Sequence, residues 1–133
     1  MYMLDTDTAS YLIRGASAHL DRRVASVAED ELCISVITRA ELLLGVRLKS
    51  EAHRLAKLVD MFLSRVPSAP WDDSAADHFA TIAAQLSSRG TPIGTMDTMI
   101  AGHAIALGAT LVTNNRRHFS RVAYLHTENW VLG

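Results

Sequence analysis

The chain has 133 residues, of which 49% are hydrophobic, so it has the length of one domain and is too apolar for a disordered segment. Thirteen basic and 14 acidic residues give a net charge of −1, and overall charge therefore does not mark a nucleic-acid-binding protein. The single cysteine, Cys33, excludes an internal disulfide and fits a reducing compartment. We expect a single domain over residues 1–133, located in the cytoplasm, with no signal peptide and no membrane span.

The first part of the chain predicts two buried strands with helices between them. Residues 2–5 are apolar up to the final acid and predict a short strand that runs into a turn. Residues 6–14 and 16–29 predict two helices that are broken near Gly15. Residues 32–35 predict a second buried strand, in which Cys33 is a packing residue.

The segment after the second strand carries the signs of a helix start. Thr38 is predicted to cap a helix that runs to about residue 48, and Glu41 stands where a capping box places an acid. Glu41 also shares one helix face with Ile37, Leu44 and Leu48, which predicts that its side chain points towards the interior. A glutamate that folds back onto Thr38 is the alternative, and both roles are compatible.

The second part of the chain continues the alternation of helices and short apolar strands. Helices are predicted by apolar residues at helical spacing, and strands by apolar runs next to Gly and Pro. The predicted helices cover residues 55–63, 74–88 and 96–107, and the predicted extended segments cover residues 67–70, 110–113 and 122–125. This alternation predicts a three-layer α/β/α domain with a mainly parallel central sheet of four to five strands.

Three acidic residues stand where apolar residues would favour the fold more. Asp5 ends the first strand, Glu41 precedes three leucines, and Asp97 opens an almost uncharged helix. A carboxylate in a low-dielectric interior is costly unless a cation pairs it. Because ligands gather at the carboxyl ends of parallel strands, we interpret the three acids as one hydrolytic site around Mg²⁺ or Mn²⁺. Taken singly, each acid could instead serve its own turn or helix end.

Other polar residues are candidates for supporting roles at the same edge of the sheet. Asp7 could join the site through water or cap the first helix. Thr6, Thr113 and Asn115 could orient metal-bound water or substrate. His103 lies about 120° from the face of Asp97 on a 3.6-residue helix, so it is interpreted as a packing or surface residue.

The basic residues are mostly arginine, the side chain suited to bidentate contact with phosphate. Eleven of the 13 basic residues are arginines. Arg116 and Arg117 lie near Arg121, and Arg22 and Arg23 form a second pair. An ordinary solvated surface explains each pair equally well.

Several segments, in the expected order, resemble the PIN domain. They are residues 3–7, residues 34–42 and residues 92–104. Residues 111–115, together with Phe119 and residues 128–130, resemble the VapC-type toxin branch of that family. The resemblance implies a Mg²⁺-dependent endoribonuclease that acts as the toxin of a type II toxin–antitoxin pair. It places Asp5, Glu41 and Asp97 at the acidic metal-site positions of the family.

The resemblance also implies a substrate and partners. Family members commonly cleave structured RNA such as tRNA or rRNA and leave 5′-phosphate and 3′-hydroxyl ends. A homodimer is implied, as is a small antitoxin whose C-terminal segment occupies the active-site groove. The toxin–antitoxin complex is expected to bind operator DNA through the antitoxin.

One position departs from the family pattern. His118 stands where the family commonly has a fourth acid, which puts a second metal ion in doubt. His118 could contact the scissile phosphate, and imidazole suits Mn²⁺ better than Mg²⁺. The departure also supports a second hypothesis, in which the chain is a catalytically weak module that binds RNA or serves in a repressor complex.

Overall fold

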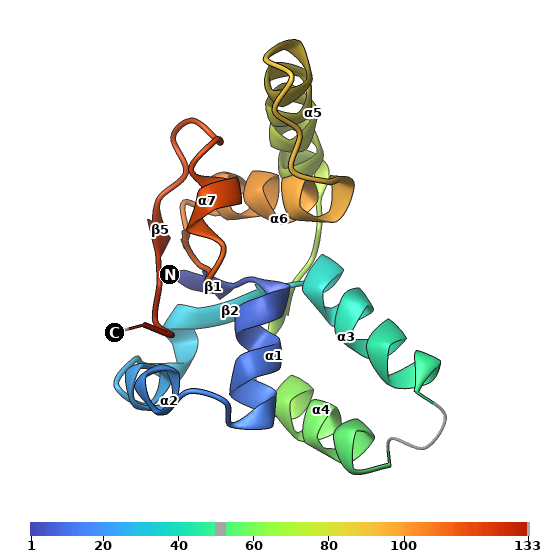
Figure 1. Cartoon of the computed structure of the whole chain (residues 1–133), viewed down its shortest axis with the longest axis vertical. Coiled ribbons are helices and arrows are strands. Elements are labelled where there is room, and N and C mark those ends of the chain that lie inside the picture. The colour runs from blue at the N-terminus through green and yellow to red at the C-terminus, as the bar shows by residue number, and fades with distance from the viewer. Residues whose placement is uncertain (50–52, 133) are drawn as a thin grey trace.

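The chain folds around one parallel sheet of five strands in the order β3-β2-β1-β4-β5 (Figure 1). The computed structural model describes residues 1–49 and 53–132. The strands are β1 (Tyr2–Leu4), β2 (Leu32–Ser35), β3 (Ser68–Ala69), β4 (Thr110–Val112) and β5 (Thr127–Glu128). The central strand β1 pairs with β2 on one side and β4 on the other. The predicted α/β class with a mainly parallel sheet is therefore confirmed.

Seven α-helices in the described residues connect these strands. They are α1 (Thr6–Arg14), α2 (Ala18–Ala25), α3 (Val36–Leu48), α4 (His53–Arg65), α5 (Asp73–Ser88), α6 (Thr95–Ala106) and α7 (Arg116–Phe119). In Figure 1, α1, α2 and α4 lie below the sheet and α6 and α7 lie above it, while α3 and α5 project outwards. None of the helices in the described part of the chain is long and apolar enough to cross a lipid bilayer.

Alternating side chains of the strands build the two apolar layers. Met3 and Leu111 pack with α5 and α6, while their neighbours Leu4 and Val112 pack with α1, α2 and α4. All four are fully buried, which contributes roughly 1.5–3 kcal/mol for each side chain. Strands buried on both faces must be apolar at every position, which explains why the short apolar runs predicted them.

Two of the predicted segments differ from the structure. Residues 122–125 do not form a strand; the fifth strand is β5, and Val122 packs into the core instead. The helix predicted over residues 16–29 is shorter, because α2 ends at Ala25 and a 3₁₀ turn covers Glu29–Glu31. The short helix α7 was not predicted, since four residues are too few for a periodic pattern.

The start of α3 also differs from the prediction. Ser35, the last residue of β2, is the N-cap, and its hydroxyl accepts a hydrogen bond from the backbone N–H of Ile37 at 3.1 Å. Thr38 is therefore inside the helix. Leu44 and Leu48 are 56% and 75% exposed, so the face that they share with Glu41 is not part of the core. The expectation that these leucines carry Glu41 into the interior is wrong.

Candidate active site

Asp5 lies at the carboxyl end of the central strand and is 3% exposed. As the N-cap of α1, its carboxylate accepts a hydrogen bond from the backbone N–H of Thr8 at 2.8 Å. Its own N–H donates to the carbonyl of Val112 on β4 at 3.0 Å, which fixes the residue between two strands. Burial raises the pKa of the Asp5 carboxyl, while hydrogen bonds from Thr113 and Thr8 counteract part of that rise. Asp5 is thus a rigidly held carboxylate in a dry position.

Glu41 projects from the second turn of α3 and is half-buried. Its Oε1 accepts a hydrogen bond from the hydroxyl of Thr6 at 2.6 Å. The hydroxyl of Thr38 lies 3.0 Å from that of Thr6 and completes a short chain of hydroxyl groups. Because one carboxylate oxygen is engaged, the other stays free to bind a ligand. Glu41 is therefore oriented by α1, the helix that Asp5 caps.

Asp97 lies in the first turn of α6, across the sheet edge from the other two acids. Burial and, after it, the negative charges of Asp5, Glu41 and Asp7 together raise the pKa of its carboxyl to about 6. His118 acts in the opposite direction. The structure thus brings all three predicted acids, with Asp7 and His118, within electrostatic reach of one another.

The turn after β4 adds an imidazole to this edge. The hydroxyl of Thr113 accepts a hydrogen bond from the backbone N–H of Asn115 at 2.9 Å. The side-chain amide nitrogen of Asn115 lies 2.9 Å from Nδ1 of His118. This contact orients the imidazole and leaves Nε2 without a partner in the described residues. Arg116 and Arg117 follow directly, are exposed, and begin α7.

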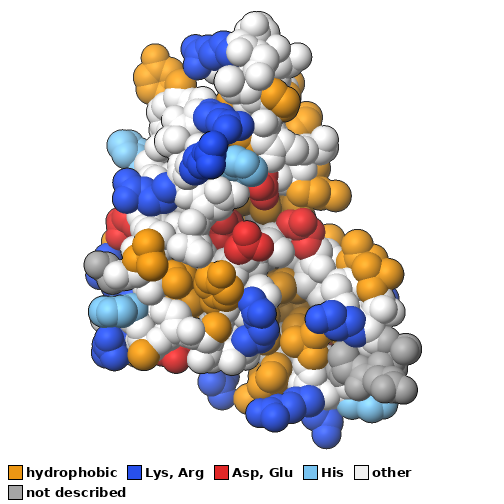
Figure 2. Space-filling view, viewed as in Figure 1, with side chains coloured by type: hydrophobic (Ala, Val, Ile, Leu, Met, Phe, Trp, Pro, Cys, Tyr) orange, Lys and Arg blue, Asp and Glu red, His pale blue; other side chains and the backbone are white. Residues whose placement is uncertain are grey.

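Acidic side chains gather at the centre of one face, between lysine and arginine side chains above and below them (Figure 2). In Figure 1 this is the face where β1 passes into α1 and β2 into α3. Such a face suits a bound polyanion, because the basic side chains attract it on both sides of the acidic centre. The acidic centre itself repels a polyanion unless a metal ion neutralises the carboxylates.

The donor chemistry of the acidic centre fits a hard divalent cation. Its candidate ligands are carboxylate oxygens, and the pKa of Asp97 is raised by burial and by neighbouring negative charge, which no Lys or Arg offsets in the described residues. Within residues 1–49 and 53–132, no three His, Cys, Asp or Glu side chains are arranged to hold a metal ion by themselves. An ion at this edge would therefore take part of its coordination from water, as Mg²⁺ commonly does.

A buried contact that the sequence did not predict links the two helices of the site. Nδ1 of His103 on α6 lies 2.8 Å from the hydroxyl of Ser35, the N-cap of α3. His103 is 1% exposed, which confirms it as a packing residue, and burial lowers its pKa. A lone histidine on an otherwise apolar helix was the only signal available. The contact couples the helix of Asp97 to that of Glu41.

Comparison with known families agrees with this geometry. The profile of the PIN domain matches residues 2–125, nearly the whole chain. The chain belongs to the PIN domain family.

Similar proteins place it among the VapC-type members of that family. It is 40% identical over 130 residues to "Ribonuclease VapC2" of Haemophilus influenzae, with 98% of each chain covered. It is 38% identical over 129 residues to the "tRNA(fMet)-specific endonuclease VapC" of Salmonella typhimurium, with 97% of each covered. Among solved structures, VapBC2 from Rickettsia felis bound to a promoter DNA fragment matches with a TM-score of 0.91 and 34% identity, over 97% of this chain and 98% of that one.

Proposed function

We propose that the chain is a metal-dependent endoribonuclease and the toxin of a type II toxin–antitoxin pair. The observation that carries the proposal is the convergence of Asp5, Glu41 and Asp97 at one edge of the sheet, where burial and the negative charges of its neighbours raise the pKa of Asp97 to about 6. Two relatives that match over nearly their full length are named as a ribonuclease and as a tRNA-specific endonuclease, which supports RNA as the substrate.

Each acid has a distinct task in the proposed hydrolysis. Asp5 and Glu41 are held by Thr8 and Thr6, so their free oxygens keep fixed positions without rearrangement during the reaction. Asp97 completes the set from the opposite layer. Together they would hold Mg²⁺, or Mn²⁺, directly or through water. When bound, such an ion lowers the pKa of water and neutralises charge on the phosphate under attack.

His118 would contact the substrate. Asn115 contacts Nδ1 and so orients the ring, and an N–H at Nε2 would be the donor to the substrate. A donor beside the acids suits a non-bridging phosphate oxygen, and Arg116 and Arg117 on the same short helix suit the flanking phosphates. Thr113 holds this turn by accepting from the backbone of Asn115 and lies against Asp5.

The direct test is cleavage of candidate tRNA and rRNA fragments with Mg²⁺, with Mn²⁺ and with EDTA. We expect cleavage with either metal, none with EDTA, and products that carry 5′-phosphate and 3′-hydroxyl ends. Asp5→Asn should lose activity yet stay folded, because asparagine caps helices as well as aspartate does. Undiminished cleavage in EDTA, or in the folded Asp5→Asn protein, would refute the proposed mechanism.

A second candidate function is RNA binding without turnover, either alone or within a repressor complex. His118 favours it, because an imidazole replaces a possible fourth oxygen ligand near Asp97. RNA binding without cleavage at any Mg²⁺ or Mn²⁺ concentration would establish this alternative. Toxicity on expression that Asp5→Asn removes would exclude it.

An apolar groove supports an antitoxin partner. The groove encloses about 510 Å³ between α1, α2 and α4 and includes Leu12, Val24 and Met61, the last of which is 53% exposed. We propose that a helix or strand of the antitoxin fills it and that operator DNA is bound through that antitoxin. Met61→Glu should weaken co-purification with the antitoxin at least tenfold while RNA cleavage stays unchanged. Wild-type capture of the antitoxin by this variant would exclude the groove.

The outer face of α3 supports a homodimer. Leu44 and Leu48 lie one turn apart and are 56% and 75% exposed, an arrangement that costs less when a second copy covers it. We propose that two copies meet along this face. Leu48→Glu should shift sedimentation from dimer to monomer, whereas Leu132→Glu, at an equally exposed leucine near the C-terminus, should not. A wild-type dimer in the Leu48→Glu protein would place the interface elsewhere.

A further inference from the structure

A small cationic pocket lies between α2 and the C-terminal segment, apart from the three acids. It encloses about 250 Å³ and is lined by His19, Arg22, Arg23, Ser26, Asn129 and Trp130. Three of these six side chains are basic or titratable, and none is acidic. Neither the proposed hydrolysis nor the apolar groove uses this pocket.

One of the two arginines is used to hold the C-terminal segment. Nη2 of Arg23 lies 3.0 Å from Oε1 of Glu128, and its guanidinium stacks 4.9 Å from the ring centre of Trp130. The indole N–H of Trp130 donates to the same carboxylate oxygen at 3.0 Å. Because the Trp130 ring is 4% exposed and covered by Arg23, it offers no surface on which a base could stack. Arg23 is therefore a structural residue of the pocket wall.

The other arginine keeps its charge free for a ligand. The Arg23–Glu128 pair is the only salt bridge in the described part of the chain, so no carboxylate there neutralises Arg22. One of its terminal nitrogens lies 3.3 Å from Nδ1 of His19, which orients the guanidinium and engages a single N–H. The remaining donors are available in the fork that matches a phosphate group.

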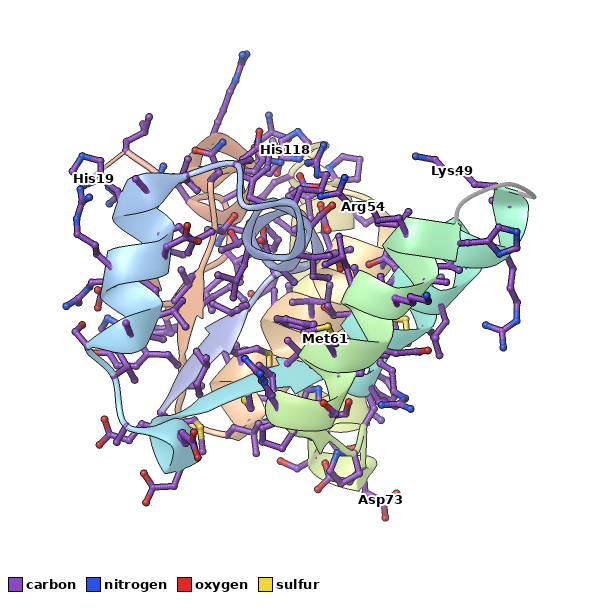
Figure 3. All side chains as sticks on the ribbon, turned by 90° about the horizontal axis from the view of Figure 1, so that it is seen from below. His19, Lys49, Arg54, Met61, Asp73 and His118 are labelled. Carbon is purple, nitrogen blue, oxygen red and sulfur yellow. The ribbon has the colours of Figure 1, made fainter. Side chains whose placement is uncertain are left out.

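A hydrogen bond joins the pocket wall to the turn that carries His118. The side-chain amide of Asn129 in the pocket donates to the side-chain oxygen of Asn114 at 3.0 Å. Asn115, the next residue, is the hydrogen-bond partner of His118. Figure 3 shows His19 at the upper left of the view, beside α2, and His118 near its top centre. A strand bound at the acids would pass these asparagines on its way to Arg22.

We propose that Arg22, oriented by His19, binds a backbone phosphate of the RNA strand several nucleotides from the scissile bond. The proposal rests on the proposed ribonuclease function and names a second point at which the substrate is held. Phosphate contact gives register and affinity without base selection, so the subsite serves long substrates of any sequence. A guanidinium without a carboxylate partner, in a pocket with no stacking surface, favours the phosphate over a base.

The test compares Arg22→Ala with Arg89→Ala. Arg89 is also exposed and unpaired in the described residues, but it ends α5, at the opposite end of the molecule from α2 (Figure 1). On a single-stranded fragment of a tRNA or rRNA that the wild type cleaves, we expect Arg22→Ala to raise KM about 5- to 10-fold with kcat unchanged. The slope of log affinity against log salt should fall by about 0.7, the value of one single-strand phosphate contact. Arg89→Ala should match the wild type in both measurements.

Substrate length separates this subsite from the acidic centre. With RNA shortened in single nucleotides from either end, the effect of Arg22→Ala should vanish below one defined length, while the wild type still cleaves. Equal KM and salt slope for the two variants on every length would overturn the subsite and leave the ribonuclease intact. Loss of antitoxin binding in Arg22→Ala, with normal RNA kinetics, would assign the pocket to a protein partner instead. If the wild-type protein cleaves no RNA, the proposed ribonuclease function is wrong, and the subsite is then tested by binding alone. Equal affinity of Arg22→Ala and Arg89→Ala for a fluorescein-labelled 12-mer RNA would overturn the subsite as well.

Discussion

Asp97→Asn is expected to lose RNA cleavage about 100-fold or more and, without divalent metal, to be more stable than the wild type. The two effects have one cause. The carboxyl of Asp97 is half-buried beside Asp5, Glu41 and Asp7, so its ionised form is disfavoured in the fold. Asparagine removes the charge that a metal ion would otherwise balance, and it removes the metal ligand with it.

The pH dependence follows from the direction of the shift. The folded-state pKa of Asp97 is raised from 3.8 to about 6, so the folded protein binds this proton more tightly than the unfolded chain does. The resulting stabilisation is complete below pH 3.8 and is lost as the pH rises through 6. At pH 7.5 the wild type therefore carries the cost of ionised Asp97. Discounted for partial exposure to water, that cost is about 1–2 kcal/mol.

Thermal unfolding from pH 4 to pH 8, with EDTA and with millimolar Mg²⁺ or Mn²⁺, measures both effects. In EDTA, Asp97→Asn should gain stability over the wild type as the pH rises from about 4 to 6 and keep that advantage above pH 6, and the difference should disappear near pH 4. Metal should raise the melting temperature of the wild type and have little effect on the variant. If metal stabilised both proteins equally, or neither, the ion would not bind at Asp97.

The sequence predicted the acidic centre well because the prediction depends on the cost of burying a carboxylate and on the sheet topology, not on local contacts. A carboxylate that follows a buried strand or opens an apolar helix is costly to bury wherever the helix finally lies. This desolvation cost alone was enough to identify Asp5 and Asp97 as candidate site residues. Their encounter also follows from topology, since parallel strands expose their carboxyl ends at one edge. The structure brings the acids together as expected, although the metal ion remains a prediction.

The prediction from sequence was wrong at the start of α3, where a strand passes directly into a helix without a loop. Thr38 and Glu41 have the spacing of a capping box, yet β2 passes directly into α3 and Ser35 takes the cap first. The hydroxyl of Thr38 then points to Thr6, and Glu41 accepts from Thr6 rather than folding back. A local pattern cannot show that α1, more than 30 residues away in the chain, supplies the partner. Such contacts between helices depend on the packed sheet.

Gly102→Ala is expected to destabilise the fold, because the backbone of α5 lies directly against α6 at this residue. A β-carbon at Gly102 would lie 2.8 Å from the backbone nitrogen of Phe79 and 2.9 Å from its Cα. Both contacts are with backbone, which cannot rotate away as a side chain can. Alanine gains up to about 1 kcal/mol in helix propensity, but overpacking costs more, so a net loss of about 1–3 kcal/mol is expected.

Gly45→Ala is the matched control. Gly45 is also inside a helix, α3, and its added β-carbon would meet no atom within 4 Å, so alanine should stabilise by about 0.5–1 kcal/mol. Chemical denaturation of both variants measures the change in the free energy of unfolding, which should be a decrease for Gly102→Ala and an increase for Gly45→Ala. Wild-type stability in Gly102→Ala would show that α5 and α6 separate at little cost. Because α6 carries Asp97, any such separation moves one acid away from the other two, and Gly102→Ala should cleave RNA more slowly even under conditions in which it is fully folded.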